Sequence, residues 1–191
     1  ILTLRDRLRK NAFAVLLCSR GAAMFLAGDE FGNTQFGNNN PYCQDNEISW
    51  LDWSRLETHR GLFTFVQRMI ALRRVHPVLR AATKPALCGW PDVSLHNGAA
   101  WNSAIDQATR QIGLLFAGRN AADTADDLVL LAVNAHWEPH EQQLPPPPVG
   151  FRWRLVMHTL CDDPFQPDTP FDGSRFVIGP RSAAVVAAEP V

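Results

Sequence analysis

Residues 22–30 read Ala-Ala-Met-Phe-Leu-Ala-Gly-Asp-Glu, an unbroken apolar run that ends at a glycine and an acidic pair. The run is too short for a typical helix, and an unbroken apolar run is typical of a strand buried on both faces, as in a parallel sheet. We therefore expect a strand over 22–27, with Asp29 and Glu30 at its carboxyl end. Strands of a βα barrel carry active-site material at that end. The pair also fits a simpler interpretation, in which one residue caps the turn and the other makes an ion pair.

Helical spacing flanks this run on both sides. Apolar residues recur every three to four positions upstream, which predicts a helix that begins near Thr3, its candidate N-cap, and stops near Gly21. Downstream, Ser54 is a candidate cap for a second helix that continues to about Arg74, with Pro77 marking its end.

A long polar stretch, residues 31–52, separates the apolar run from the second helix. Loops of this length in compact domains are usually functional or disordered. The aromatic residues in this stretch need burial or a ligand, which argues against disorder. Amides, carboxylates and aromatic rings together are the residue types that sugar recognition needs, because hydroxyl groups require polar partners and the apolar sugar face requires a flat ring.

From about Pro85, short apolar runs alternate with turn-forming clusters, which is typical of an antiparallel sandwich or barrel. The expected strands cover residues 111–117, 128–135, 153–159, 175–178 and 183–188. The change of pattern divides the chain into units 1–84 and 85–191. The run Pro145–Pro148 is expected to be a surface connection, with a docking motif for a partner as the alternative.

Composition excludes several classes of protein. The 191 residues are 46% hydrophobic and 19% charged, with a formal net charge of −1, so neither a disordered chain nor a polyelectrolyte that binds nucleic acid or anionic membrane is expected. No apolar run is long enough for a membrane span. Four dispersed cysteines favour a reduced, cytoplasmic compartment. His136 and His140 lie four apart, but Pro139 argues against a helix there, so no metal or cofactor site is expected.

Four segments of the loop form a long, ordered string: Gly28–Gly32, Gly37–Asn40, Tyr42–Glu47 and Trp50–Trp53. This string resembles the bacterial glycogen debranching enzymes of isoamylase type, which belong to the α-amylase superfamily, glycoside hydrolase family 13. The segment Val133–Pro139 resembles them as well. The resemblance implies an α/β plus all-β fold. Residues 1–84 would form the last βα unit of a (β/α)8 barrel, and residues 85–191 a C-terminal antiparallel β-sandwich.

The resemblance also implies hydrolysis of α-1,6 branch linkages by a retaining mechanism, which needs two carboxyl groups roughly 5 Å apart. The family's catalytic carboxylates would lie upstream of Ile1, so the chain, which lacks an initiator methionine, is expected to be a C-terminal fragment without hydrolase activity. The strand-eight loop would flank the substrate cleft. The matching positions expected to line or support it are Asp29, Glu30, Asn38, Asn39, Asn40, Tyr42, Asp45 and Asn46.

The same resemblance makes Trp50 and Trp53 loop anchors and Cys43 a packed thiol, while Asn33 stands where the family often has an arginine. The expected partners are a branched α-glucan, either glycogen or a limit dextrin, and the missing barrel segment. An unpaired strand would also promote self-association through residues 22–27. Two alternatives stay open: a non-catalytic carbohydrate-binding or interaction module, and a related α-glucan hydrolase such as a trehalose-releasing enzyme.

Overall fold

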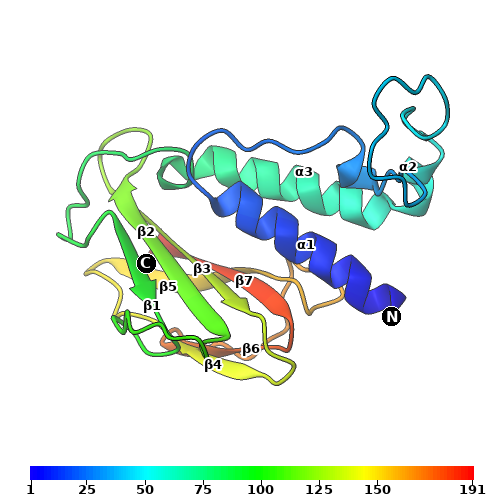
Figure 1. Cartoon of the computed structure of the whole chain (residues 1–191). Helices are drawn as coiled ribbons and strands as arrows, with labels where there is room; N and C mark the ends of the chain where they lie inside the picture. The colour runs from blue at the N-terminus through cyan, green and yellow to red at the C-terminus, as the bar shows by residue number, and fades with distance from the viewer.

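Two long helices lie side by side against one face of an antiparallel sheet in the computed structural model, which describes residues 1–191 (Figure 1). The helices are α1 (Leu2–Cys18), α2 (Arg55–Thr58) and α3 (Arg60–Val75), with 3-10 turns at Asp29–Phe31 and Pro77–Leu79. The strands are β1 (Val93–His96), β2 (Gln111–Arg119), β3 (Asp126–Asn134), β4 (His140–Gln143), β5 (Phe151–His158), β6 (Arg175–Ile178) and β7 (Ser182–Pro190). None of the helices combines the length and apolarity that crossing a membrane requires.

The main sheet has the strand order β1-β2-β3-β7-β5, and every neighbouring pair is antiparallel. A separate two-stranded sheet pairs β4 with β6. In the centre of the main sheet, Leu131 of β3 lies opposite Leu114 of β2 and Val185 of β7. The antiparallel arrangement expected for the second half of the chain is therefore confirmed, although its second layer is only a two-stranded sheet.

The central strand β3 is apolar from Leu128 to Val133 because both of its faces are covered there. Val129 and Leu131 pack with α1 and α3, whereas Leu128 and Leu130 pack on the opposite face with residues of β5 and β6. Alternate side chains of a strand point to opposite faces, so one strand contributes to two hydrophobic cores. The molecule consequently has three layers, with the main sheet between the helices and the small sheet.

The five strands expected from the sequence are all present, with ends that differ by at most two residues. Strands β1 and β4 were not expected. Each has only four residues, and β4 has the polar sequence His-Glu-Gln-Gln, so neither shows the apolar run that would reveal it. They form because neighbouring chain segments provide backbone partners.

The strand expected over residues 22–27 is absent, and this prediction is wrong for the structure of this chain. Residues 22–26 belong to no ladder, and no backbone amide from residue 22 to 27 donates a hydrogen bond to another backbone group. A strand exists only where a neighbour pairs with it, and all strands of this chain pair within the second half. Phe25 packs edge-on against Phe13 of α1 at 5.3 Å, while Met24 and Leu26 are exposed. The barrel unit is thus not formed here, and self-association through this segment stays a prediction.

The ends of the helices also differ from expectation. Thr3 is not a cap, since α1 begins at Leu2 and no side chain caps it. The helix ends at Cys18, before Gly21. The helix expected over 54–74 is broken at His59 into α2 and α3. His59 packs against the turn at Gly32, so a tertiary contact coincides with the break.

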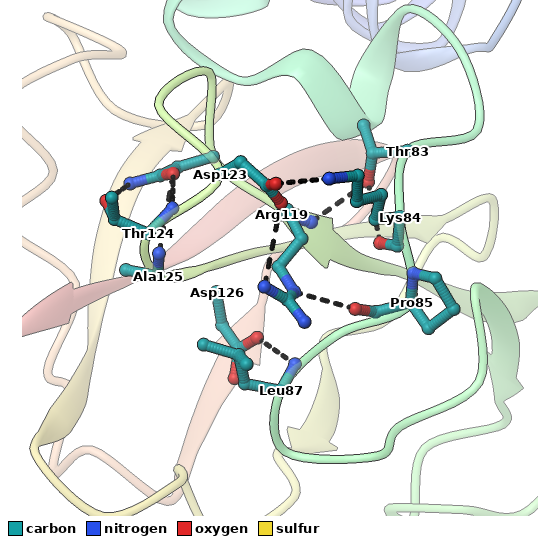
Figure 2. A network of polar contacts seen from close by, with 10 residues as sticks. Thr83, Lys84, Pro85, Leu87, Arg119, Asp123, Thr124, Ala125 and Asp126 are labelled. Atoms are coloured by element: carbon teal, nitrogen blue, oxygen red, sulfur yellow. Dashed lines mark hydrogen bonds and ion pairs between the residues drawn. The ribbon is translucent and has the colours of Figure 1, made fainter.

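The connection between the helices and the sheet is tied to the β2–β3 hairpin by a polar network (Figure 2). The backbone amide of Arg119 donates to Thr83 Oγ1 and its Nε to the carbonyl of Pro85, both at 2.9 Å. The buried carboxylate of Asp126 accepts the amides of Leu87 and Cys88. These bonds fix where the chain enters the β-rich half, while the division into units 1–84 and 85–191 stays a prediction.

Candidate functional site

The Gly28–Gly32 segment forms a tight turn that begins the long loop. Gly28 and Gly32 have φ angles of +96° and +71°, in the left-handed region where side chains are disfavoured, and they flank the 3-10 turn at Asp29–Phe31. The carboxylate of Glu30 accepts the Gly28 amide at 2.8 Å. Glu30 therefore braces the turn from within.

Three basic side chains hold the far end of this turn. Arg55 Nε donates to the carbonyl of Gly32 at 2.6 Å, and Arg55 Nη2 lies 3.2 Å from His59 Nε2. A β-carbon on Gly32 would lie 2.6 Å from Arg9 Nη1, so α1 also packs directly on the turn. Burial, together with the charges of Arg9 and Arg55, lowers the pKa of His59. Protonation of His59 is thus disfavoured beside Arg9 and Arg55.

Asp29 lies at a pocket of about 290 Å³ between α1 and the turn. Phe13 and Phe25 form part of its apolar wall, and Arg9 and Asn33 contribute polar groups. Burial raises the pKa of Asp29, a backbone hydrogen bond from the segment at Leu26 opposes that change, and the charge of Glu30 adds to it. Asn33 Oδ1 accepts the amide of Asp52 at 3.1 Å, which joins the two ends of the loop. Asn33 therefore has a structural role in closing the loop.

The asparagines of the loop build a series of side-chain turns. Each uses its carbonyl oxygen to accept the amide two residues ahead: Asn38 from Asn40 at 2.8 Å, Asn40 from Tyr42 at 3.2 Å, and Asn46 from Ile48 at 3.0 Å. Such turns are a known use of asparagine. The side-chain NH₂ groups are left without a protein partner and are available as donors. The loop thus holds three amide donors in fixed positions.

Exposed aromatic rings accompany these donors. Tyr42 is 82% exposed and Phe36 is 68% exposed. Phe36 was not among the expected site residues. No pattern in the sequence shows that a phenylalanine within a loop stays in solvent, and its φ angle of +53° is equally hidden there.

Trp50 and Trp53 anchor the loop and yet remain more than half exposed. Trp50 Nε1 donates to Asp45 Oδ1 at 2.8 Å, and Trp53 stacks on the buried ring of Phe31 with 5.2 Å between ring centroids. Asp45 therefore orients a tryptophan.

Asn39 is exposed and makes no side-chain hydrogen bond within the chain. The expected site residues thus divide into a bracing group at the turn and an exposed group around residues 36–46.

The thiol of Cys43 is exposed, so the expectation that it packs in the loop is wrong. The residue also has a φ angle of +56°, in the left-handed region that side chains disfavour. Cys18 behaves oppositely, because burial raises the pKa of its thiol to about 12.

We expect a thiol reagent to modify Cys43 first and to reach Cys18 only after unfolding. The thiolate is the reactive form, so the raised pKa alone slows Cys18 on the order of a thousandfold near neutral pH. Stopped-flow labelling of the native chain measures this, with Cys43→Ser as the control that removes the fast phase. A fast phase that survives in Cys43→Ser would contradict the assignment.

Replacing Gly28 with alanine is expected to lower the free energy of unfolding by about 2–4 kcal/mol. The new β-carbon would lie 2.7 Å from Asn33 Cβ and 2.9 Å from Leu51 Cδ2, in addition to the unfavourable φ. Gly37→Ala is the matched control, since its φ is +87° but nothing lies within 4 Å, and it should cost only about 1 kcal/mol. Urea unfolding of both variants measures the difference, and equal losses would refute the packing argument.

Comparison with known proteins identifies relatives of this chain. No family model matches the chain. The protein described as "Isoamylase 3, chloroplastic" from Oryza sativa subsp. japonica is 33% identical over 194 aligned residues, which cover 100% of this chain and 23% of the relative. A "Glycogen debranching enzyme" from Pectobacterium atrosepticum is 34% identical over 171 residues, 82% of this chain and 24% of the relative. The chain therefore spans about a quarter of the length of these relatives.

Solved structures share the fold. A pullulanase from Bacillus acidopullulyticus superimposes with a TM-score of 0.71 over 96% of this chain and 20% of that protein, at 20% sequence identity. A pullulanase variant from Paenibacillus barengoltzii, solved in complex with maltotriose, gives a TM-score of 0.68 over 98% of this chain and 26% of that protein, at 23% identity. The succession of helices and antiparallel sheets seen here is thus part of those larger enzymes.

Proposed function

We propose that this chain, whose homologues are glycogen debranching enzymes and an isoamylase of glycoside hydrolase family 13, is part of an enzyme that hydrolyses α-1,6 linkages in branched α-glucans. Within that enzyme it would supply one wall of the glucan cleft. The single observation that carries this role is the exposed group at residues 36–46, a short segment that contains both oriented amide donors and the exposed residues Phe36 and Tyr42.

The catalytic carboxyl groups are proposed to come from sequence outside these 191 residues. Retaining hydrolysis needs a nucleophile and an acid facing each other across the scissile bond. Glu30 uses its carboxylate to accept the Gly28 amide, and Asp29 borders a pocket whose apolar wall belongs to α1 and Phe25. This arrangement supports a bracing role for the acidic pair. A cytoplasmic location also stays a prediction.

The experiment is a titration of the isotope-labelled chain with maltohexaose, followed by NMR. We expect amide shifts concentrated at residues 36–46 in the unmodified chain and weakened binding in Tyr42→Ala. Tyr42→Phe retains the ring and should retain binding. Absence of shifts in this segment at saturating sugar would refute the proposed wall.

Activity is tested on the same protein by the release of reducing ends from a branched glucan. We expect none, because the carboxylate of Glu30 accepts the Gly28 amide and the catalytic acids are proposed to come from sequence outside this chain. Turnover above the blank that disappears in Asp29→Asn or Glu30→Gln would show that the acidic pair is catalytic. It would then overturn the assignment of the acids to sequence outside the chain.

A further inference from the structure

A second group of exposed polar and aromatic residues lies between the β1–β2 and β3–β4 connections. Trp137 is 67% exposed, and its ring stacks on that of His136 with 4.1 Å between centroids and an interplanar angle of 30°. His136 also lines an open pocket of about 490 Å³ together with His140, Asn97 and Arg110. Strand β4, which begins at His140, lies at the other end of the molecule from the loop around α2 (Figure 1).

The turn that carries Trp137 is held rigidly. The buried side chain of Asn134 accepts the amide of His136 at 2.8 Å and donates to the carbonyl of Glu138 at 2.8 Å. The carbonyl of His136 in turn accepts the amide of Arg181 at 2.8 Å. A buried amide that bonds to both sides of a turn fixes the backbone of that turn, and the indole that it carries stacks on His136.

The hydrogen bonds assign the tautomers of the two histidines. His136 Nδ1 accepts the Glu138 amide at 3.2 Å and therefore carries a lone pair, which His140 Nε2, 3.1 Å away, shares as a second donor. In the neutral pair, the proton of His136 is on Nε2 and the lone pair of His140 is on Nδ1. The pair therefore leaves one donor and one acceptor unused by the protein.

The pocket offers further mixed hydrogen-bonding groups without a dominant charge. Asn97 Nδ2 donates to the carbonyl of Ala104, which leaves its Oδ1 as a fixed acceptor. Arg110 is held through Nη1 by the carbonyls of Gln107 and Thr109, and its other nitrogens are unused. Asp106 also lines the pocket, which therefore contains one carboxylate and one guanidinium. A strongly ionic ligand is thus disfavoured.

From this arrangement we infer that the Trp137–His140 turn and its pocket form a second binding site for a neutral oligosaccharide of α-linked glucose. A flat exposed indole accepts the apolar face of a sugar ring, while fixed donors and acceptors in the adjoining pocket satisfy hydroxyl groups. The ligand class rests on the proposed function, but the site is separate from the loop at residues 36–46. Together, this site and the loop at residues 36–46 would hold a branched polymer at two places.

The test is an NMR titration with maltohexaose that compares the unmodified chain with Trp137→Ala, Trp137→Tyr and Tyr42→Ala. We expect amide shifts at residues 136–140 with a dissociation constant that rises roughly fivefold to tenfold in Trp137→Ala. Trp137→Tyr keeps a flat ring and should bind within about threefold of the unmodified chain. Because Trp137 is exposed, circular dichroism should show an unchanged fold in these variants.

The Tyr42→Ala variant separates the two proposals. If it loses shifts at residues 36–46 but retains those at 136–140, both sites exist. If the unmodified chain shows no shifts at 136–140, or if Trp137→Ala leaves the affinity there unchanged, the second site is refuted while the loop site stands. Shifts only at 136–140 would refute the loop site and support the inference drawn here.

Discussion

Replacing Arg73 with methionine is expected to lower the free energy of unfolding by about 3–5 kcal/mol. The guanidinium of Arg73 in α3 donates to four carbonyl groups: those of Leu17 at 2.8 Å, Ser19 at 2.7 Å, Leu79 at 2.6 Å and Gly21 at 2.5 Å. The last turn of a helix leaves carbonyls without partners. Arg73 therefore satisfies the end of α1 and binds it to the segment that leads into the loop.

Urea unfolding measures this loss, and Arg74→Met is the matched control. Arg74 is the next residue, is exposed and makes no hydrogen bond or ion pair within the chain, so its replacement should change stability by less than about 0.5 kcal/mol. Arg73→Lys should fall between the two, since an ammonium on a flexible chain cannot reproduce the planar donors. Equal stability of Arg73→Met and Arg74→Met would show that the four bonds contribute nothing net.

Acidification is expected to destabilise the chain through His158, whose pKa is lowered to about 4. Burial is the main cause, with the charge of Arg7 lowering the pKa further and that of Asp168 raising it. His158 is 1% exposed; its Nδ1 lies 2.7 Å from Thr169 Oγ1 and its Nε2 3.2 Å from Ser182 Oγ. The ring fits this site in its neutral form.

The direction in which stability changes with pH follows from the number of protons that the folded and unfolded chains bind. Between about pH 6.5 and pH 4 the unfolded chain binds a proton at this histidine and the folded chain does not, so stability falls as the pH falls through this window. The contribution is complete above about pH 6.5 and its loss amounts to on the order of 3 kcal/mol at pH 4.

Urea unfolding at pH 7 and pH 4.5 tests this prediction in the unmodified chain and in His158→Gln, which keeps a polar group but does not titrate. The variant should be less stable at pH 7 and should lose markedly less stability on acidification. NMR titration of the His158 ring gives a second readout, and a midpoint near 6.5 would contradict the argument.

Local patterns predicted much of this fold. Leu128–Ala135 and Ala183–Ala188 were recognised because each is a short apolar run between turn-forming residues, and the structure shows strands there. The same rule failed for residues 22–27. An apolar extended segment becomes a strand only when another backbone supplies hydrogen bonds, and that condition lies outside the segment itself.

The candidate site also has features that the sequence predicts and features that it does not. Its glycines, asparagines and aromatic rings were identifiable because the Gly28–Trp53 string is long and specific. Phe36 and the exposed thiol of Cys43 were not, since neither the exposure nor the positive φ angle of a non-glycine residue shows in the local sequence. Trp137 was equally hidden, because nothing in the local sequence shows that His136 stacks beneath it.

Residue types and their spacing thus establish the order of helix, loop and strands, the kind of chemistry that the loop offers, and its likeness to debranching enzymes. Tertiary structure alone decides that Arg73 donates to four separate carbonyls, that His158 is held neutral, and that two hydrophobic cores lie on opposite faces of β3. The physical reason is the distance along the chain over which each effect acts. Backbone propensity and periodicity act over a few residues, whereas burial and hydrogen-bond partners depend on segments that are distant in the chain.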